Sequence, residues 1–140
     1  MTIQKATKQD ANALFQLEQK VFDSFNSPLS KRSFYYHIGK NLLLIAKKEK
    51  NVAGYILILT SFKCPRIYSI AVDPNFERQG IGKKLLEKAL KRNNCLRLEV
   101  RKDNEKAIRL YEKIGFEIIG EKLNYYDDGC DAWEMRRVYM

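Results

Sequence analysis

Between residues 66 and 101 the spacing of apolar residues changes from that of a strand to that of a helix and back again, and few folds accommodate such a change. Residues 66–72 have the composition of a strand, and Asp73-Pro74 ends it because proline cannot donate to a strand ladder. From residue 80 to about residue 92 the apolar side chains recur at helical spacing, at Ile81, Leu85, Leu86, Ala89 and Leu90. Residues 96–101 then alternate between apolar and charged types, which is typical of a half-buried strand. This order of strand, helix and strand predicts an α/β fold.

Further elements extend the pattern in both directions. Strands are predicted at residues 2–6, 42–46, 52–59, 116–119 and 133–139, and helices at 8–22, 30–37 and 104–114. The expected helix starts and ends are Thr7 with Asp10, Ser30, Gly39 and Gly115. Residues 26–28 form a break, and residues 47–51 form a polar turn. The order is β-α-α-β-β-β-α-β-α-β-β, which predicts a single domain, residues 1–140, with helices on both faces of a mixed sheet.

The composition fits a folded chain outside the membrane. Of the 140 residues, 45% are hydrophobic and 31% charged, which excludes a disordered chain and allows a sizeable core. The longest uninterrupted apolar run, residues 55–59, is too short to cross a membrane, and the first residues have no apolar signal region. We therefore expect no membrane partner and a cytoplasmic location.

The net charge of +9 comes from 26 Lys and Arg against 17 Asp and Glu. Such a field attracts polyanions: a nucleic acid, an anionic cofactor or an acidic protein surface. The charge equally suits lysines that simply solvate helix faces, so the charge alone does not choose a partner. Because no RNA- or DNA-binding motif is present, we expect no direct binding of nucleic acid.

The cysteines and the single histidine predict little chemistry. Cys64, Cys95 and Cys130 are odd in number and far apart, which argues against a disulfide framework or a zinc knuckle and suits a reducing cytosol. One histidine, His37, leaves little room for a histidine-rich metal site or a histidine-based triad. We expect no metal and no catalytic part for these four residues.

Residues 78–83, Arg-Gln-Gly-Ile-Gly-Lys, connect the predicted strand to the next helix. Two glycines let several backbone N–H groups converge on one ligand, and the helix dipole adds positive potential. Arg78 and Lys83 add full charges, and the combination suits a pyrophosphate. The segment matches neither a Walker loop nor the dinucleotide fingerprint, so an ordinary helix start after a turn is an equally open interpretation.

Two motifs resemble those of the GCN5-related N-acetyltransferase (GNAT) superfamily. The pattern Arg/Gln-x-x-Gly-x-Gly/Ala is met by residues 78–82, or by residues 79–82 in another register, after a family-like strand at 69–74. The later pattern Asn-x-x-Ala-x-x-Leu-Tyr-x-x-x-Gly-Phe is met in full by residues 104–116. Leu-Glu-Val-Arg at 98–101 and Asn-Tyr-Tyr at 124–126 are similar to the bacterial ribosomal-protein-alanine N-acetyltransferase (RimI) family. The resemblance covers essentially the whole chain.

The resemblance implies a mostly antiparallel, twisted sheet of about seven strands with four helices, and transfer of an acetyl group from acetyl-CoA to an amine. The implied acceptor is the N-terminal α-amino group of a protein such as a ribosomal protein, and the implied state is a monomer or weak dimer. The implied cofactor contacts are Ile70, Ala71, Val72, Arg78, Gln79, Gly80, Ile81, Gly82, Lys83 and Asn104. By the same resemblance, Glu99 is the general base and Tyr111 the general acid.

The chemistry requires groups of these types because only a neutral amine attacks a thioester. Deprotonation at pH 7 costs about 1 kcal/mol for an α-amino group and about 4–5 kcal/mol for a lysine. A carboxylate accepts that proton, and a phenol donates one to the departing sulfur. Ordinary structural roles remain open: Glu99 as a solvent-facing strand residue paired with Arg97 or Arg101, Tyr111 as a core residue, and Asn104 as an N-cap.

The acceptor end of the site is the least defined by sequence. Tyr125 and Tyr126, with Trp133, Asp127 and Asp128 nearby, are the candidate acceptor contacts, and hairpin packing explains them equally well. Residues 26–34 are the expected opposite wall, although Pro-Leu-Ser stands at 28–30 where many relatives have Pro-Trp-Ser, and the hairpin after Tyr126 is short. Lysine side chains and small amines therefore remain alternative acceptors. A regulator that binds acyl-CoA without turnover is the alternative of another class.

Overall fold

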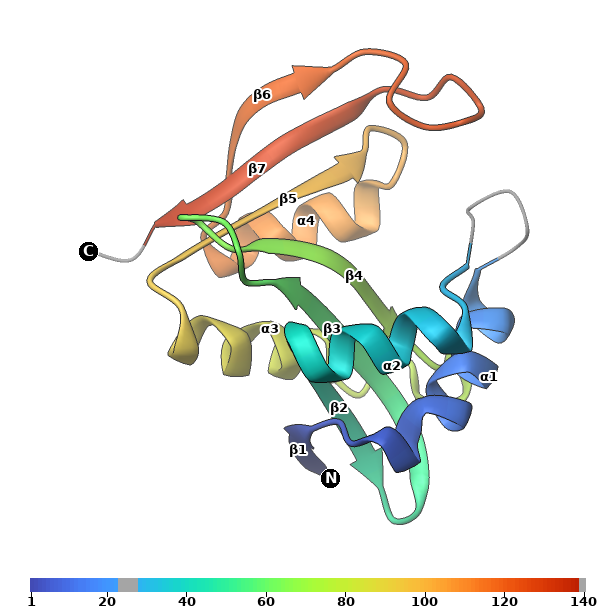
Figure 1. Cartoon of the computed structure of the whole chain (residues 1–140). Coiled ribbons are helices and arrows are strands. Elements are labelled where there is room, and N and C mark those ends of the chain that lie inside the picture. The colour runs from blue at the N-terminus through green and yellow to red at the C-terminus, as the bar shows by residue number, and fades with distance from the viewer. Residues whose placement is uncertain (23–27, 139–140) are drawn as a thin grey trace.

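The described residues of the computed structural model, 1–22 and 28–138, contain one seven-stranded sheet in the order β1-β2-β3-β4-β5-β7-β6 (Figure 1). The strands are β1 (Thr2–Lys5), β2 (Leu42–Lys48), β3 (Asn51–Leu59), β4 (Arg66–Val72), β5 (Cys95–Arg101), β6 (Glu117–Lys122) and β7 (Ala132–Val138). The helices are α1 (Ala11–Val21), α2 (Lys31–Lys40), α3 (Ile81–Arg92) and α4 (Glu105–Ile114), with short 3₁₀ turns at η1 (Lys8–Asp10) and η3 (Pro74–Phe76). The mixed sheet and the order of the elements confirm the predicted fold.

Helix ends follow the sequence signals with one exception. The Ser30 hydroxyl accepts from the Ser33 N–H at 3.1 Å, the Asn104 side chain accepts from the Ala107 N–H at 3.2 Å, and Gly115 ends α4 with φ +109°. The prediction that Gly39 ends α2 is wrong, because the helix continues to Lys40 and Asn41 is its C-cap. In the described part of the chain, no helix combines the length and the apolar character needed to cross a membrane.

Strand ends differ from prediction by a few residues. Pairing of β2 with β3 extends to Lys48 and Asn51, so the polar turn shrinks to residues 49–50. Strand β6 runs to Lys122, beyond the predicted end at residue 119, because it keeps its pairing with β7. Residue 139 of the predicted last strand and residues 26–27 of the predicted break lie outside the described residues.

Among the described residues, one pair of neighbouring strands, β4 and β5, is paired at a single position. All other neighbours in the sheet are antiparallel, whereas β4 and β5 are parallel and in register only at Arg66 and Arg97. Beyond that pair the strands move apart, as Figure 1 shows. The sheet is therefore split into one arm of β1–β4 and another of β5, β7 and β6. Within residues 1–22 and 28–138, the edge of β4 that faces β5 has no strand partner along most of its length.

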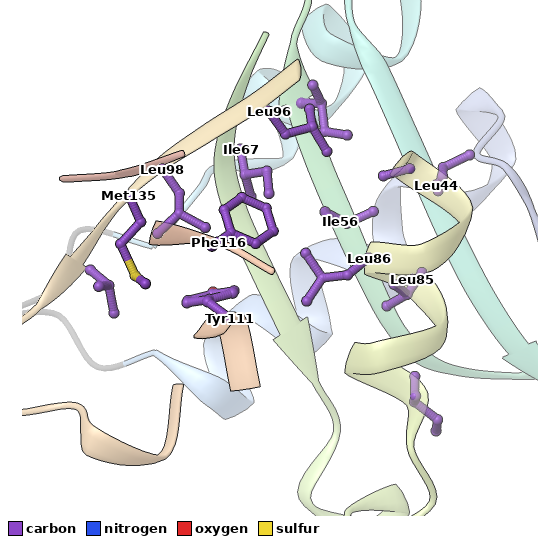
Figure 2. Close-up of a cluster of buried hydrophobic side chains, with 14 of the residues drawn as sticks. Leu44, Ile56, Ile67, Leu85, Leu86, Leu96, Leu98, Tyr111, Phe116 and Met135 are labelled. Carbon is purple, nitrogen blue, oxygen red and sulfur yellow. The ribbon is translucent and has the colours of Figure 1, made fainter. Parts of the chain in front are cut away.

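Two apolar clusters hold helices on the two faces of the sheet. One lies under α3 and α4 and includes Leu86, Leu98, Tyr111, Phe116 and Met135 (Figure 2). The other lies under α1 and α2 and is formed by side chains such as Leu14, Leu17, Phe34, Ile45 and Leu57. Six consecutive residues of β3 are buried because this strand lies between both clusters.

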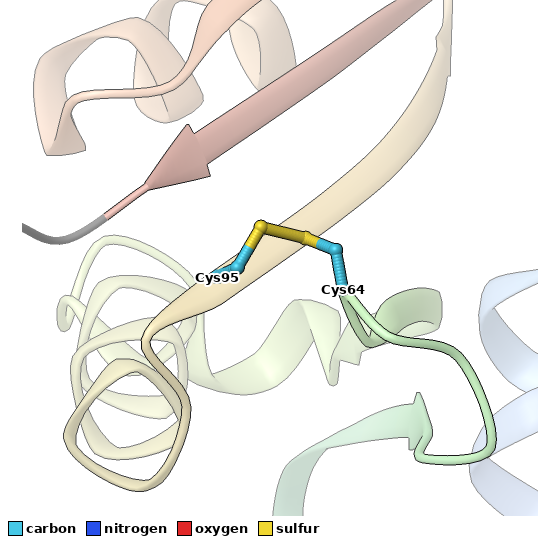
Figure 3. The surroundings of a disulfide bond; sticks show 2 residues. All are labelled: Cys64 and Cys95. Atoms are coloured by element: carbon cyan, nitrogen blue, oxygen red, sulfur yellow. A yellow bond between two sulfur atoms is a disulfide. The ribbon is translucent and has the colours of Figure 1, made fainter.

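The expectation of unpaired cysteines is wrong for two of the three. Cys64 and Cys95 form a disulfide, while Cys130 is free (Figure 3). The pairing follows from the sheet: Arg66 lies opposite Arg97, so the residues two positions earlier also face each other. The disulfide could not be predicted from the sequence, because no sequence feature shows that β4 and β5 are neighbouring strands. Among the described residues no group of His, Cys, Asp and Glu side chains is arranged to hold a metal ion.

Candidate active site

A cleft of about 490 Å³ opens where β4 and β5 separate. Its lining comes from α1, β4, β5, α4 and the connection between β6 and β7. The predicted site residues that line it are Ile70, Glu99, Asn104, Tyr111, Tyr125, Tyr126 and Asp127. Leu29 also lines the cleft, so the described part of the predicted opposite wall reaches it. The split of the sheet thus brings the predicted base, acid and acceptor contacts to one cavity.

Glu99 projects its carboxylate into a group of cations. Its neighbours Leu98 and Val100 are buried on the other face of β5, as the alternation predicts. The Glu99 side chain is only 3% exposed, so the interpretation as a solvent-facing residue is wrong. Oε2 accepts from Nε of Arg66 at 2.9 Å, and Oε1 accepts from Nζ of Lys122 at 3.0 Å. Arg97, the partner expected from sequence, lies farther away, with Nη1 3.7 Å from Oε1.

Tyr111 packs in the core, which is one of the two roles that the sequence left open. Its ring lies in the core, with its centroid 5.7 Å from that of Phe116 (Figure 2). Tyr111 also lines the cleft, where the predicted role of proton donor would require it to lie. Burial, with a smaller contribution from Tyr126, raises the pKa of Tyr111 to about 12. The phenol therefore stays protonated at neutral pH, as a proton donor requires.

Tyr125 and Tyr126 are packed edge to face, with ring centroids 5.1 Å apart, at the mouth of the cleft. The Tyr125 hydroxyl accepts from Nη2 of Arg66 at 2.7 Å. Asp127 lines the cleft, whereas Asp128 lies 2.6 Å from Nη2 of Arg101 and does not.

Trp133 is absent from the cleft lining, contrary to the aromatic cluster suggested by sequence. It packs against the core beneath α4, and Nζ of Lys102 lies 4.1 Å from its ring centroid.

The segment 78–83 has the backbone geometry of an anion site. Gly80 is the N-cap of α3 with φ +71°, and Arg78 also has a positive φ of 65°. The first intrahelical bond runs from the Lys84 N–H to the Gly80 carbonyl, which leaves the three preceding N–H groups of the helix start unpaired within it. A Cβ on Gly80 would meet no atom within 4 Å, so the space beside the N-cap itself is open.

At some of the predicted cofactor contacts, only backbone groups are available to bind the cofactor. The Ile81 and Ala71 side chains are buried, one in each apolar cluster. The Gln79 side chain accepts from Nζ of Lys48 at 2.9 Å. Val72 lies beside Gly82, because a Cβ on Gly82 would be 3.8 Å from its Cγ2. The loop thus continues the line of Ile70 and Val72 along β4, although it does not line the cleft around Glu99.

Several residues of the cleft escaped sequence analysis. Glu18 of α1 is 2% exposed, lines the cleft and accepts from the Leu29 N–H at 2.6 Å. Its position on the apolar stripe of the helix was the one signal that could have revealed it. Arg66 and Lys122 gave no signal, because charged residues at strand ends are common.

Comparison with known proteins gives a consistent result. Residues 11–116 match the family model described as the acetyltransferase (GNAT) family. The N-alpha-acetyltransferase RimI of Mycobacterium tuberculosis is 32% identical over 146 residues, which cover 98% of this chain and 92% of that protein. The uncharacterized protein ML0378 of Mycobacterium leprae is 36% identical over 140 residues, which cover 94% of this chain but 39% of that protein. The crystal structure of the ribosomal-protein-S18-alanine N-acetyltransferase from Escherichia coli superposes with a TM-score of 0.88 at 31% identity, covering 99% of this chain and 94% of that one.

Proposed function

The chain belongs to the acetyltransferase (GNAT) family and is an N-acetyltransferase, and on this premise we propose that its acceptor is the N-terminal α-amino group of a protein. Two similar proteins support this choice, since the Mycobacterium tuberculosis relative is named an N-alpha-acetyltransferase and the Escherichia coli structure is named for ribosomal protein S18. A ribosomal protein that begins with alanine after removal of its first methionine is therefore the acceptor to test first.

Acetyl-CoA, the acyl donor of the family, supplies the activated thioester. In the proposal, the N–H groups at the start of α3, together with Arg78 and Lys83, hold its diphosphate. The edge of β4 at Ile70 and Val72 has unpaired backbone groups beyond Arg66, and these hold the amide-bearing arm by the hydrogen bonds that a strand would make. Asn104, whose side chain caps α4, contributes a wall of the same cleft.

The chemical step uses one carboxylate and one phenol. Glu99 accepts the proton that the amine must lose, either directly or through a water molecule. Tyr111 donates its hydroxyl proton toward the departing sulfur and regains a proton from solvent. For an α-amino group the deprotonation costs only about 1 kcal/mol at pH 7, so a base as weak as a carboxylate is a sufficient acceptor.

One observation carries the proposal: Glu99 of β5 and Tyr111 of α4 line the same cleft, where the sheet splits. The experiment is a panel of peptides that begin with Ala or Ser, with free or blocked N-termini, incubated with acetyl-CoA. We expect release of free thiol and an acetyl group on the N-terminal amine, located by mass spectrometry. Label on lysine side chains or only on small amines would reassign the acceptor, and binding of CoA without thiol release would show a regulator.

A further inference from the structure

Arg66 occupies the position at which, among the described residues, the strands of the two arms are paired. Its backbone is in register with Arg97, and the carbonyl of the preceding residue, Pro65, accepts from the Arg97 N–H at 3.0 Å. The disulfide lies two residues earlier. The base of the Arg66 side chain is therefore fixed at the closed end of the cleft.

The guanidinium of Arg66 contacts the opposite arm twice. Nε donates to Oε2 of Glu99 at 2.9 Å, and Nη2 donates to the Tyr125 hydroxyl at 2.7 Å. The group also lies 5.7 Å from the centroid of the Tyr68 ring, which fixes its plane from the β4 side. One side chain of β4 thus holds a residue of β5 and a residue of the β6–β7 connection at the same time.

The other cations near Glu99 do not make the same pair of hydrogen bonds. Lys122 and Arg97 both approach Oε1. Nζ of Lys122 also lies 5.3 Å from the centroid of the Tyr125 ring, but neither cation bonds to the Tyr125 hydroxyl. A lysine in place of Arg66 would carry a single nitrogen, whereas the guanidinium presents separate donors in a rigid fork. Holding one carboxylate and one phenol in fixed positions therefore needs an arginine.

We infer that Arg66 is a positioning residue of this enzyme: it orients the Glu99 carboxylate and fixes the Tyr125 side of the acceptor mouth across the cleft. The inference rests on the proposed function, in which Glu99 takes the amine proton. With Oε2 bonded to Arg66, and Oε1 bonded to Lys122 and close to Arg97, the carboxylate keeps one rotation and its remaining lone pairs point in fixed directions. Misplacement of a catalytic group by about 1 Å can cost about a hundredfold in rate.

The test compares Arg66→Ala and Arg66→Lys with wild type and with Arg92→Ala, an exposed arginine at the end of α3. We expect Arg66→Ala to lower kcat between about tenfold and a hundredfold and to raise KM for the acceptor peptide, with KM for acetyl-CoA unchanged. Arg66→Lys should recover only part of kcat, and millimolar guanidinium should restore activity to Arg66→Ala but not to Tyr125→Phe. Arg92→Ala should behave as wild type.

The outcomes are distinguishable. A folded Arg66→Ala enzyme with unchanged kcat overturns the inference and leaves the proposed function standing, and so does full recovery in Arg66→Lys, because charge alone would then suffice. A loss that only tracks a lower melting temperature, without rescue by guanidinium, also overturns it. Absence of acetyl transfer by the wild type overturns the proposed function and the inference together.

Discussion

The Tyr55 hydroxyl on β3 donates a hydrogen bond to Oε1 of Glu18 on α1, and both residues are buried. The Ser69 hydroxyl completes the arrangement as donor to the Tyr55 oxygen at 2.8 Å, because the single phenol proton points to the carboxylate. The other oxygen of Glu18 accepts from the Leu29 N–H, which ties the wall of the cleft to the sheet. Burial raises the pKa of Glu18, although the bonds from Tyr55 and Leu29 oppose the shift.

The raised pKa of Glu18 predicts a specific pH dependence of stability. A carboxyl group whose pKa is higher in the folded than in the unfolded chain binds more protons when folded, so its contribution falls as pH rises from about 4.5 through the folded pKa. We expect the free energy of unfolding of wild type minus that of Glu18→Gln to decline over this range. Urea denaturation of both proteins from acid to neutral pH measures the difference, and a flat or rising difference would contradict the assignment.

Replacing Glu99 by glutamine keeps its size and removes its capacity to accept a proton. We expect Glu99→Gln to lower the rate at saturating acetyl-CoA by about 10² to 10⁴-fold, the usual value of acid–base catalysis. Thiol release with an N-terminal peptide is the measurement. An unchanged rate here, together with an unchanged rate in the tyrosine variant below, would remove both residues from the mechanism.

Tyr111→Phe removes the hydroxyl and keeps the ring, so this variant tests the role of the hydroxyl alone. The ring that packs on Phe116 is kept in this variant, so we expect the free energy of unfolding to stay within about 1 kcal/mol of wild type. The rate at saturating acetyl-CoA should fall. Because burial raises the pKa of Tyr111 to about 12, ionisation of this group should cause no loss of wild-type activity below pH 10. A stability loss as large as the activity loss would show a purely structural tyrosine.

The disulfide closes a loop with a sequence separation of 31 residues. We expect Cys64→Ser or Cys95→Ser to lower the free energy of unfolding by about 2–4 kcal/mol under oxidising conditions, through the larger entropy of the unfolded chain. Cys130→Ser is the matched control, because Cys130 is free. Urea denaturation with and without a dithiol reductant gives the answer: equal stabilities of wild type and Cys64→Ser without reductant would exclude a stabilising disulfide.

Two glycines provide opposite outcomes for one substitution. Gly39 lies within α2 with no atom within 4 Å of an added Cβ and no positive φ, so Gly39→Ala should raise the free energy of unfolding by about 0.5–1 kcal/mol. Gly80 has φ +71°, so Gly80→Ala should lower it by about 1–2 kcal/mol and raise KM for acetyl-CoA. Denaturation and thiol-release kinetics report the two effects. A normal KM in Gly80→Ala would argue against cofactor binding at this turn.

The helices and strands could be predicted from short stretches of sequence, because the spacing of apolar residues in each stretch reflects which of its side chains are buried. The alternation of residues 96–101 matches the burial of Leu96, Leu98 and Val100, and Asn104 and Gly115 lie at the two ends of α4. These residues report on contacts or backbone angles formed within one element, and a short stretch of sequence contains the necessary information.

Contacts between distant elements could not be predicted in the same way. The Cys64–Cys95 disulfide and the Arg66–Glu99 pair both depend on β4 lying next to β5, and the sequence gives no measure of that. Trp133 looked like a neighbour of Tyr125 along the chain, yet the direction of β7 places it against the core. Lys122 belongs to the part of β6 that extends beyond the predicted end of this strand, so its contact with Glu99 was not predicted.

The separation of β4 from β5 places a polar backbone edge in the interior of the sheet. An edge at the rim of a sheet is open to pairing with strands of other proteins. This edge lies between the two arms, beside a cleft of about 490 Å³, which is too small to hold a folded domain. A molecule that pairs with this edge must therefore place an extended segment in the cleft.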